Sequence, residues 1–343
     1  MDRGLRHVSR FHDVKTYRSM KVLSLFDGIS CGRVALERAG IPVSRYVAFE
    51  IDQNAINCSN WNFPDIEHCG SVVGRDFTEF IGFDIVMGGF PCQDLSIAGK
   101  RKGLKGKRSS LFWYLVEAIE TVNPRYFLVE NNVGMPKEAE DIITDTLGVM
   151  PISINSALVS AQTRKRLYWT NIPGVEQPED RNIFLSDIIK NGYGIHGNKS
   201  MALTASYGGA VIWNSLERKQ RTMVAEPIVL YQRPRGYNKG GFTVTEKSPP
   251  ITVSNWQNNV YIVTDGVISI QNKRGVMPYK ISIPDGEYLI RKFTPEECEL
   301  LQGLPAGYTE MIPKTYRYRT LGNGWNVDTL AHIFNYINID MLV

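Results

Sequence analysis

Short apolar runs alternate with amphipathic stretches over the first half of the chain. The apolar runs lie at 22–26, 46–50, 83–87 and 126–130, and continuous runs of this length are typical of buried parallel strands. Between them, apolar residues recur at helical spacing over 32–39 and 111–122; the second stretch follows Ser109 and Ser110 as possible caps and stops before Pro124. This alternation predicts an α/β fold with a doubly wound sheet.

The pattern changes near Pro173. After two late strands predicted at 152–160 and 166–171, residues 180–288 are rich in Thr, Val, Ile, Gly, Asn and Pro with short alternating runs, which predicts a smaller β-rich region. Helical spacing returns at 293–304, with Thr294 as cap and Pro295 in the first helical position, and again at 326–337. We therefore expect four segments: 1–20, 21–172, 173–289 and 290–343.

Composition limits the kinds of protein this can be. Hydrophobic residues make up 43% and charged residues 22% of the 343 residues, and there is neither an apolar run of about 20 residues nor a secretory signal, so we expect a cytoplasmic protein without a membrane span. Five cysteines without C-x-x-C spacing argue against a disulfide framework and a zinc site. The net charge of +4 permits a polyanionic partner. The basic segment 1–20 is interpreted as a flexible extension, with a phosphate-binding arm as the alternative.

The segment GGFPCQDLS (88–96) carries the strongest chemical signal. Pro91 fixes the backbone before Cys92, and the strand at 83–87 precedes them, so the thiol lies on a turn at the carboxyl end of a strand, where open α/β sheets bind ligands. A lone cysteine is more often a small buried apolar residue. This segment, however, resembles the catalytic Pro-Cys-Gln block of DNA cytosine-5 methyltransferases, and further blocks follow in that family's order over 21–172 and 290–337.

The resemblance implies a Rossmann-like methyltransferase sheet, S-adenosylmethionine as cofactor, double-stranded DNA as partner and no metal. The turn SLFDGISCG (24–32) does not fit the G-x-G-x-x-G of nicotinamide enzymes but resembles the family's cofactor turn. Glu50 ends the second strand, where a carboxylate accepts hydrogen bonds from ribose hydroxyls. Asp76 resembles the adenine-contacting acid, and YRTLGNGWNV (318–327) resembles the last cofactor block. The expected cofactor contacts are Phe26, Asp27, Gly28, Ile29, Glu50, Ile51, Asp76, Phe77, Pro91, Asn323 and Trp325.

Two further blocks supply the expected catalytic partners of Cys92. A thiol is mostly protonated at neutral pH, and cytosine is a poor electrophile unless charge at its N3 is neutralised. FLVENNVGM (127–135) resembles the family's Glu-Asn-Val block, although it reads Glu-Asn-Asn-Val, and Glu130 is expected to donate to N3. QTRKRLYW (162–169) resembles the family's block whose alternating Gln and Arg line the target base and nearby phosphates, and on an extended segment Gln162, Arg164 and Arg166 point to one face. Arg166 is expected at the cytosine O2, Arg164 at a phosphate, and Gln162 beside the target base.

Two basic stretches are candidates for DNA contact. SIAGKRKGLKGKRSSLF (96–112) resembles the family's mobile loop, and Gln93, Ser96, Lys100, Arg101 and Arg108 are the residues expected to contact DNA. In YQRPRGYNKGGF (231–242), Arg233 and Arg235 suit guanine edges and Asn238 suits an adenine. The alternative, that these arginines contact only phosphate, stays open.

The resulting prediction is a DNA cytosine-5 methyltransferase, an enzyme type of restriction–modification systems, acting through a covalent Cys92 adduct on a flipped base. One rival is a base methyltransferase acting on an exocyclic nitrogen. Such enzymes carry a Pro-Pro-aromatic block, and the Pro-Pro in SPPI (248–251) has no aromatic partner. Methylation of RNA is a variant of this rival. The second rival is a non-catalytic DNA-binding or regulatory protein on the same fold.

Overall fold

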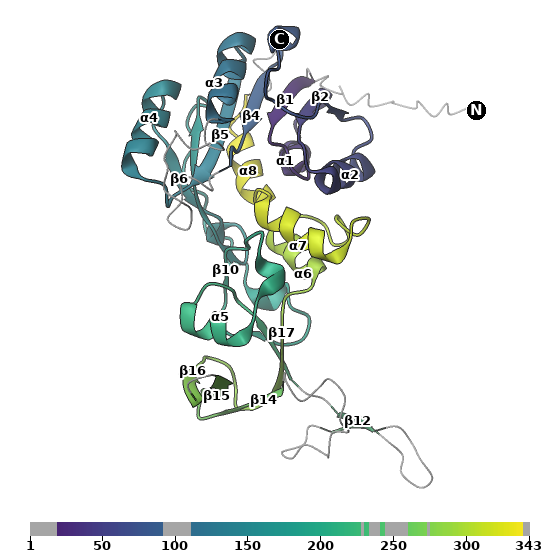
Figure 1. The fold of residues 1–343 in the computed structure, drawn as a ribbon, viewed down its shortest axis with the longest axis vertical. Helices are drawn as coiled ribbons and strands as arrows, with labels where there is room; N and C mark the ends of the chain where they lie inside the picture. The colour runs from purple at the N-terminus through teal and green to yellow at the C-terminus, as the bar shows by residue number, and fades with distance from the viewer. Residues whose placement is uncertain are drawn as a thin grey trace, which may run out of the picture.

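The chain has two lobes, one above the other in Figure 1. The computed structural model describes residues 19–91, 111–227, 230–232, 241–243, 260–272 and 275–338. The upper lobe holds the N-terminal strands and helices, and the C-terminal helices, drawn in yellow, return to it after the chain has formed the lower lobe (Figure 1). The first and last described segments of the chain therefore share one lobe.

A seven-stranded sheet forms the centre of the upper lobe. Its order is β3-β2-β1-β4-β5-β8-β6, with β1 parallel to β2 and β4, β4 parallel to β5, and β8 antiparallel to β5 and β6. The strands are β1 Met20–Leu25, β2 Val43–Phe49, β3 Glu67–His68, β4 Ile85–Gly88, β5 Tyr126–Asn132, β6 Ile152–Asn155 and β8 Lys165–Thr170. The order reverses between β1 and β4, and ligands bind at such a switch point in open α/β sheets. The predicted doubly wound sheet is confirmed.

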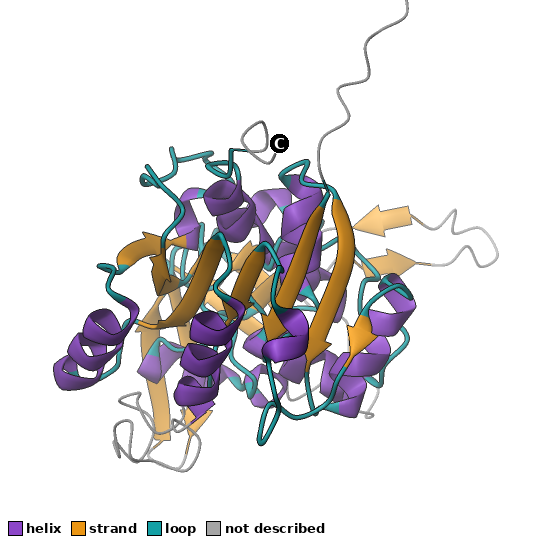
Figure 2. Ribbon diagram, turned by 90° about the horizontal axis from the view of Figure 1, so that it is seen from above, coloured by secondary structure: helices purple, strands orange, loops and turns teal. Residues whose placement is uncertain are grey.

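Helices cover both faces of this sheet (Figure 2). They are α1 Cys31–Arg38, α2 Gln53–Asn62, α3 Leu111–Val122, α4 Lys137–Leu147, α6 Pro295–Leu301, α7 Lys314–Asn323 and α8 Val327–Phe334. Successive strand residues point to opposite faces, so Tyr46 packs in the core that includes α1, α6, α7 and α8, while Val47 packs in the core that includes α3 and α4. Two apolar cores thus hold the sheet between helical layers.

Local sequence signals set several element boundaries. Helix α3 covers the predicted stretch. Helix α6 begins after Thr294 with a capping box, in which the Thr294 hydroxyl and the Glu297 carboxylate each accept the other residue's backbone N–H. The strand predicted at 152–160 was wrong beyond Asn155, because the Asn155 side chain accepts the N–H of Ala157 and starts a short 3₁₀ helix, η3 Ser156–Leu158.

The lower lobe contains a separate six-stranded sheet in the order β16-β15-β14-β17-β11-β9. All its pairs are antiparallel, as the β-rich texture predicted. Its strands are β9 Tyr193–Gly194, β11 Val224–Pro227, β14 Val260–Thr264, β15 Val267–Asn272, β16 Gly275–Lys280 and β17 Gly286–Arg291. Helix α5 Ile212–Arg218, which the pattern did not indicate, packs its Ile212 and Leu216 into the small core of this sheet.

Short elements complete the description. Two small pairs join β7 Gln162–Thr163 to β10 Ser200–Met201 and β12 Leu230–Gln232 to β13 Gly241–Thr243; the remaining 3₁₀ helices are η1 Thr78–Phe80, η4 Leu185–Asp187 and η5 Tyr207–Gly209. No helix in the described ranges is long and apolar enough to cross a membrane. Within the same ranges, no cluster of three or more His, Cys, Asp or Glu side chains is placed to hold a metal ion.

Candidate active site

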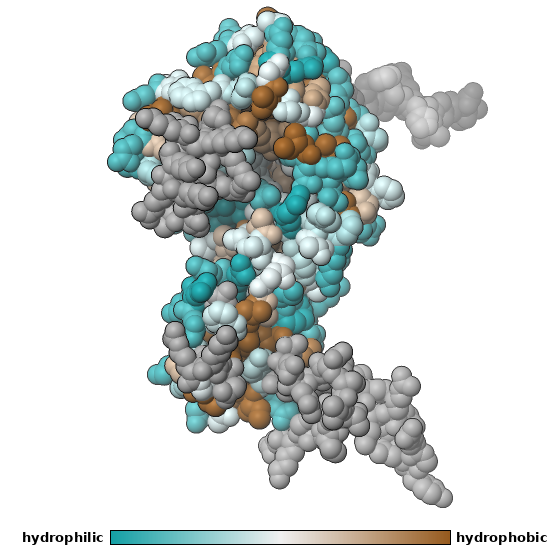
Figure 3. Space-filling view, in the orientation of Figure 1, coloured by the Kyte–Doolittle hydropathy of each residue, from teal (hydrophilic) through white to brown (hydrophobic). Residues whose placement is uncertain are grey.

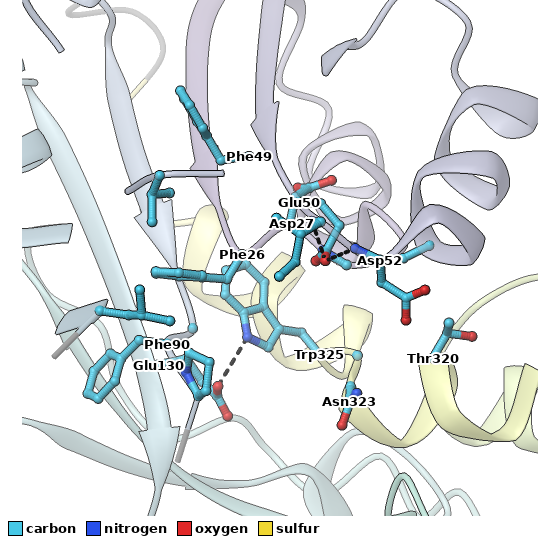
Figure 4. Close-up of a pocket in the computed structure, with 18 of the residues that line it drawn as sticks. Phe26, Asp27, Phe49, Glu50, Asp52, Phe90, Glu130, Thr320, Asn323 and Trp325 are labelled. Atoms are coloured by element: carbon cyan, nitrogen blue, oxygen red, sulfur yellow. Dashed lines mark hydrogen bonds between the residues drawn. The ribbon is translucent and has the colours of Figure 1, made fainter. Parts of the chain in front are cut away.

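A cavity of about 840 Å³ lies at the carboxyl ends of the parallel strands. Its walls come from the segments after β1, β2, β3 and β4, from β5, β8 and α3, and from α7 and the residues that follow it. The space-filling view shows the upper lobe hollowed, with apolar surface beside the hollow (Figure 3). Segments from both ends of the sequence therefore meet around one cavity (Figure 4).

The turn after β1 is built from left-handed residues. Phe26, Gly28 and Ser30 have φ of 59°, 63° and 60°, a region that non-glycine residues seldom adopt. A Cβ built on Gly28 would have no atom within 4 Å, so the backbone there stands open to the cavity that Gly28 lines. The Gly28 N–H donates to Glu50 Oε2 at 2.9 Å, which fixes the turn against the end of β2.

The Asp27 carboxylate stabilises this turn through hydrogen bonds to neighbouring side chains. It accepts the hydroxyls of Ser24 at 2.6 Å, Ser30 at 2.5 Å and Tyr46 at 2.6 Å, and burial raises the pKa of Asp27. Asp27 lines the cavity as the sequence predicted. Its carboxylate oxygens are nevertheless occupied by these hydroxyls, so its side chain acts as a support for the turn.

Glu50 is one of four acids that line the cavity, together with Asp27, Asp52 and Glu130. The Oε1 of Glu50 accepts the backbone N–H groups of Ile51 and Asp52, both at 2.8 Å, and Figure 4 shows Glu50 beside the β1 turn. Ile51 is 77% exposed although it is apolar, and it lines the cavity. Asp52 forms an ion pair with Arg319 of α7, which joins the two sides of the cavity rim.

Three predicted cofactor residues lie elsewhere. Asp76 is exposed and accepts the N–H of Thr78 at 2.9 Å, and Phe77 is buried against Phe49 with ring centroids 5.9 Å apart. Ile29 is buried in the core, and its carbonyl accepts the Tyr308 hydroxyl at 2.7 Å. Neither Asp76, Phe77 nor Ile29 lines the cavity. Residues 70–73, which the sequence analysis missed, line it instead; their signal is that they follow β3 at the same sheet edge.

Glu130 and Arg166 form the charged pair of the cavity. Arg166 Nε lies 2.8 Å from Glu130 Oε1, because β5 and β8 pair antiparallel with Asn132 opposite Arg166 and the two side chains meet on the diagonal. The indole Nε1 of Trp325 donates to Glu130 Oε2 at 3.1 Å (Figure 4). Glu130 is only 8% exposed, so the carboxylate is held at the cavity wall with a donor on each oxygen.

Arg164 and Gln162 are buried and bound to backbone groups of the protein. The Arg164 guanidinium is 4% exposed and donates to the carbonyls of Leu203 and Gly324, both at 3.0 Å; burial, then the charge of Arg166, lowers its pKa to about 10. Gln162 is fully buried, with its amide bonded to Leu203 N–H and to the Leu301 carbonyl. Arg164 lines the cavity but is committed to carbonyls, and Gln162 does not line it. Both side chains satisfy buried backbone groups in this structure, and their expected contacts with phosphate and base stay predictions.

The segment after β4 is held by Asn131. Its Nδ2 donates to the Phe90 carbonyl at 3.2 Å, and Phe90 and Pro91 line the cavity. The structure thus brings Pro91 beside Glu130, Asn323 and Trp325, which also line the cavity. The remaining expected site residues lie outside the described ranges: Cys92, Gln93, Ser96, Lys100, Arg101, Arg108, Arg233, Arg235 and Asn238.

The cavity wall offers groups that suit a nucleoside ligand. Glu50 offers a carboxylate that accepts hydrogen bonds, Ile51 and Val72 offer apolar contact, and the open backbone at Gly28 is a cradle that a Cβ would fill. Asn323 is exposed on the α7 side. These residues match the donor and acceptor chemistry of an adenosyl ligand.

Comparisons with known proteins agree with this arrangement. The type II methyltransferase M1.ScrFI of Lactococcus lactis subsp. cremoris is 27% identical over 339 residues, covering 95% of this chain and 79% of that protein. The orphan methyltransferase M.Rho11sI of Bacillus phage rho11s is 30% identical over 161 residues, covering 43% of this chain. The aligned region spans only 32% of the M.Rho11sI sequence, and for the orphan methyltransferase M.SPRI of Bacillus phage SPR it spans 39%.

Solved structures share the fold. The Entamoeba histolytica methyltransferase EhMeth superposes with a TM-score of 0.64 at 15% identity, covering 95% of this chain and 99% of that one. The S. pombe Dnmt2 methyltransferase gives a TM-score of 0.58 at 17% identity, covering 92% and 97%. A sequence model of the family described as C-5 cytosine-specific DNA methylase matches residues 20–338. This chain therefore belongs to the C-5 cytosine-specific DNA methylase family.

Proposed function

We propose that this protein transfers a methyl group from S-adenosylmethionine to C5 of a cytosine in double-stranded DNA. The observation that carries the proposal is the single cavity that joins the Gly28–Glu50 turn to the Glu130–Arg166 pair. The first is suited to an adenosyl group and the second to the edge of a pyrimidine ring. Family membership supports the same reaction.

The target cytosine must leave the base stack, because C5 and C6 are out of reach inside the duplex. The Cys92 thiolate adds to C6 and forms a C–S bond, while Glu130 delivers a proton to N3 and keeps the ring neutral. Arg166, held by Glu130 at 2.8 Å, lies where it can bind the cytosine O2. S-adenosylmethionine, when bound, supplies the methyl group as a sulfonium.

C5 of the cytosine, now the nucleophilic end of an enamine, forms the new bond to the methyl carbon as the bond from that carbon to sulfur breaks, which leaves S-adenosylhomocysteine. A base then removes the C5 proton, the C5–C6 double bond forms again, and the C–S bond breaks. Cys92 leaves as a thiolate, ready for another cytosine. Pro91 lines the cavity directly before Cys92 in the sequence, which supports placing the nucleophile at this wall.

We further propose that residues 173–289 recognise the DNA sequence and that residues 21–172 and 290–343 carry out the chemistry. The basic segment 96–112 and the arginines of 231–242 supply the positive charge that such an interface needs. In this arrangement the lower lobe selects the site and the upper lobe receives the flipped base.

Covalent trapping tests the proposal. A duplex carrying 5-fluorocytosine at the target, together with S-adenosylmethionine, is expected to give a stable protein–DNA adduct, because fluorine does not leave as a proton does. The target is found first, by sequencing DNA after treatment with the protein and mapping the methylated cytosines. Cys92→Ser is expected to give no adduct.

The matched control is Cys69→Ser, at a partly exposed cysteine that does not line the cavity, and it is expected to keep the adduct. Cofactor binding separates chemistry from folding: S-adenosylhomocysteine at about 100 times its dissociation constant stabilises a binding protein by about 2.7 kcal/mol, and Cys92→Ser should retain this gain. An adduct with Cys92→Ser, or no methylation by the unaltered protein, would overturn the proposal.

A further inference from the structure

Trp325 makes a contact with Glu130 that a cofactor-binding role does not explain. Its Nε1–H donates to Glu130 Oε2 at 3.1 Å, while Arg166 Nε lies 2.8 Å from Oε1. An indole N–H is a donor only, and a carboxylate that is 8% exposed has few water molecules to replace it. Figure 4 shows this bond crossing the cavity wall from the segment after α7 to the end of β5.

The backbone on both sides of Trp325 is pinned. The carbonyl of Gly324 accepts Arg164 Nη2 at 3.0 Å and Gln302 Nε2 at 3.3 Å. On the other side, Asn326 is the N-cap of α8: its Oδ1 accepts the N–H of Thr329 at 3.0 Å. These buried bonds fix the backbone from which the indole ring of Trp325 projects toward Glu130.

The contact also depends on a residue without a side chain. A Cβ built on Gly89 would lie 2.6 Å from Trp325 Nε1 and 3.0 Å from Glu130 Oε2. Both separations are shorter than van der Waals contact allows. The backbone that leads from β4 toward Pro91 therefore packs directly on the Trp325–Glu130 pair, which ties three separate segments together at one point.

We infer that Trp325 is a positioning residue for Glu130. Arg166 binds one carboxylate oxygen and Trp325 the other, so the plane of the carboxyl group is fixed by two donors from different segments. Rotation about the terminal side-chain torsion, which is broad for glutamate, is thereby restricted, and the edge of Glu130 stays turned to the cavity. The inference rests on the proposed function, in which Glu130 acts at the cytosine N3.

The test removes the N–H and keeps the ring. Trp325→Phe retains an aromatic wall for the cavity, and 3-benzothienylalanine at position 325 keeps the shape of tryptophan with sulfur in place of N–H. Both are expected to lower the single-turnover rate of methyl transfer by about tenfold, the size of one hydrogen bond to a charged group. Affinity for S-adenosylhomocysteine, measured by calorimetry, is expected to change by less than about threefold, because the ring remains.

A double-mutant cycle separates positioning from a general structural effect. In a Glu130→Ala background, replacement of Trp325 is expected to cost almost nothing further, since residues that act through one another are not additive. The matched control is Trp61→Phe, at a 67% exposed tryptophan on α2 outside the cavity wall, which should leave rate and affinity unchanged. Thermal unfolding of every variant checks the fold.

The outcomes are distinct. A benzothienyl variant as fast as the unaltered protein would overturn the inference and leave the proposed function in place. An equal loss of rate and of cofactor affinity, or full additivity with Glu130→Ala, would likewise show that Trp325 serves only as a wall. No methyl transfer by the unaltered protein, or full activity of Glu130→Ala, would instead contradict the proposed function.

Discussion

The two lobes differ in the number of charged side chains that they bury. In the upper lobe, the buried side chains include Asp27, Glu130 and Arg164, gathered at one edge of a parallel sheet. In the lower lobe, the described residues from 180 to 290 bury only three polar side chains, Ser200, Ser215 and Thr222, and no charged one. Burying a charge costs free energy unless it is paired. The upper lobe bears this cost at the cavity and also in α6, where Glu297 pairs with Arg291 and Glu299 with Arg317.

Backbone groups and apolar side chains both join the lobes: Tyr207 packs against Phe293 and Tyr318 with ring centroids 5.8 and 5.9 Å apart. Leu203, near the start of the lower region, is bonded through its N–H to Gln162 and through its carbonyl to Arg164. Next to it, the backbone of Thr204 and Ala205 lies against Gly322 of α7. Gln162 and Arg164 of the QTRKR block thus bind the lower lobe to the upper one at Leu203.

The largest expected effect comes from a substitution at the contact between the two lobes. Gly322→Ala would place a methyl group inside the Thr204–Ala205 backbone, which cannot yield as a side-chain end can. We expect the free energy of unfolding, measured in urea, to fall by about 3 kcal/mol. Gly→Ala within a helix is otherwise stabilising by roughly 0.5–1 kcal/mol. A fall in the free energy of unfolding would therefore show that Gly322 is in close contact with the Thr204–Ala205 backbone.

Gly32→Ala is the matched control for this contact. A Cβ there would lie 2.5 Å from Met87 Cε, the free end of a flexible side chain within the upper lobe, so a much smaller loss is expected. Equal stability changes at Gly32 and Gly322 would contradict the idea of a close contact between the lobes at Gly322.

Next in size is the effect of Glu50, which sharpens the assignment of the upper lobe as the cofactor lobe. Glu50→Ala removes the carboxylate at the cavity wall, and we expect the affinity for S-adenosylhomocysteine to fall by about 2 kcal/mol, the size of a hydrogen bond to a charged group. Calorimetry measures this directly. Glu67→Ala, at an acid paired with Arg45 away from the cavity, should bind normally, and unchanged affinity in Glu50→Ala would refute the role.

A smaller effect tests whether the region 173–289 recognises the DNA sequence. If Arg233 or Arg235 binds a guanine edge, its replacement by alanine should cost about 1–3 kcal/mol on the preferred site and relax choice at one position. If it binds phosphate, the affinity for all DNA sequences should fall alike, and the slope of log affinity against log salt concentration should decrease in size by about one. Methylation profiles on random-sequence DNA distinguish the two, and an unchanged preference in both variants would place recognition elsewhere.

The smallest expected effect concerns the support of the cofactor turn. His68 Nε2 lies 3.1 Å from Ser59 Oγ, which lies 2.5 Å from Ser30 Oγ, and Ser30 donates to Asp27. Burial lowers the pKa of His68, so the unfolded chain binds the proton more readily than the folded one. Stability from this group is present above about pH 6.5, the unfolded value, and is lost as the pH falls through the folded pKa.

His68→Gln should therefore reduce the decline of the unfolding free energy between pH 7.5 and pH 5.5 without removing it. His196, whose pKa burial also lowers, contributes with the same sign. An identical pH dependence in His68→Gln and the unaltered protein would exclude this contribution.

Local pattern was sufficient for much of the fold. The apolar runs at 22–26, 46–50, 83–87 and 126–130 became β1, β2, β4 and β5 with small shifts, because a buried strand needs continuous apolar residues whatever surrounds it. The cap at Thr294 and the stop before Pro124 depended only on neighbours in the chain. Motif order also identified the family, and the structure placed Gly28, Glu50, Pro91, Glu130 and Trp325 around one cavity.

The tertiary structure alone decided which of these side chains face the cavity and which form their hydrogen bonds with other groups of the protein. Arg164 is bound by a carbonyl 160 residues away in sequence, and Trp325 reaches a carboxylate 195 residues away. No local pattern encodes such partners. Buried donors and acceptors must be satisfied by whatever backbone the fold brings near. Gln162 and Arg164 therefore form hydrogen bonds with the backbone of Leu203, where the two lobes meet. The sequence determined which chemical groups are present at the sheet edge, and packing across distant segments determined which of them remain free to act.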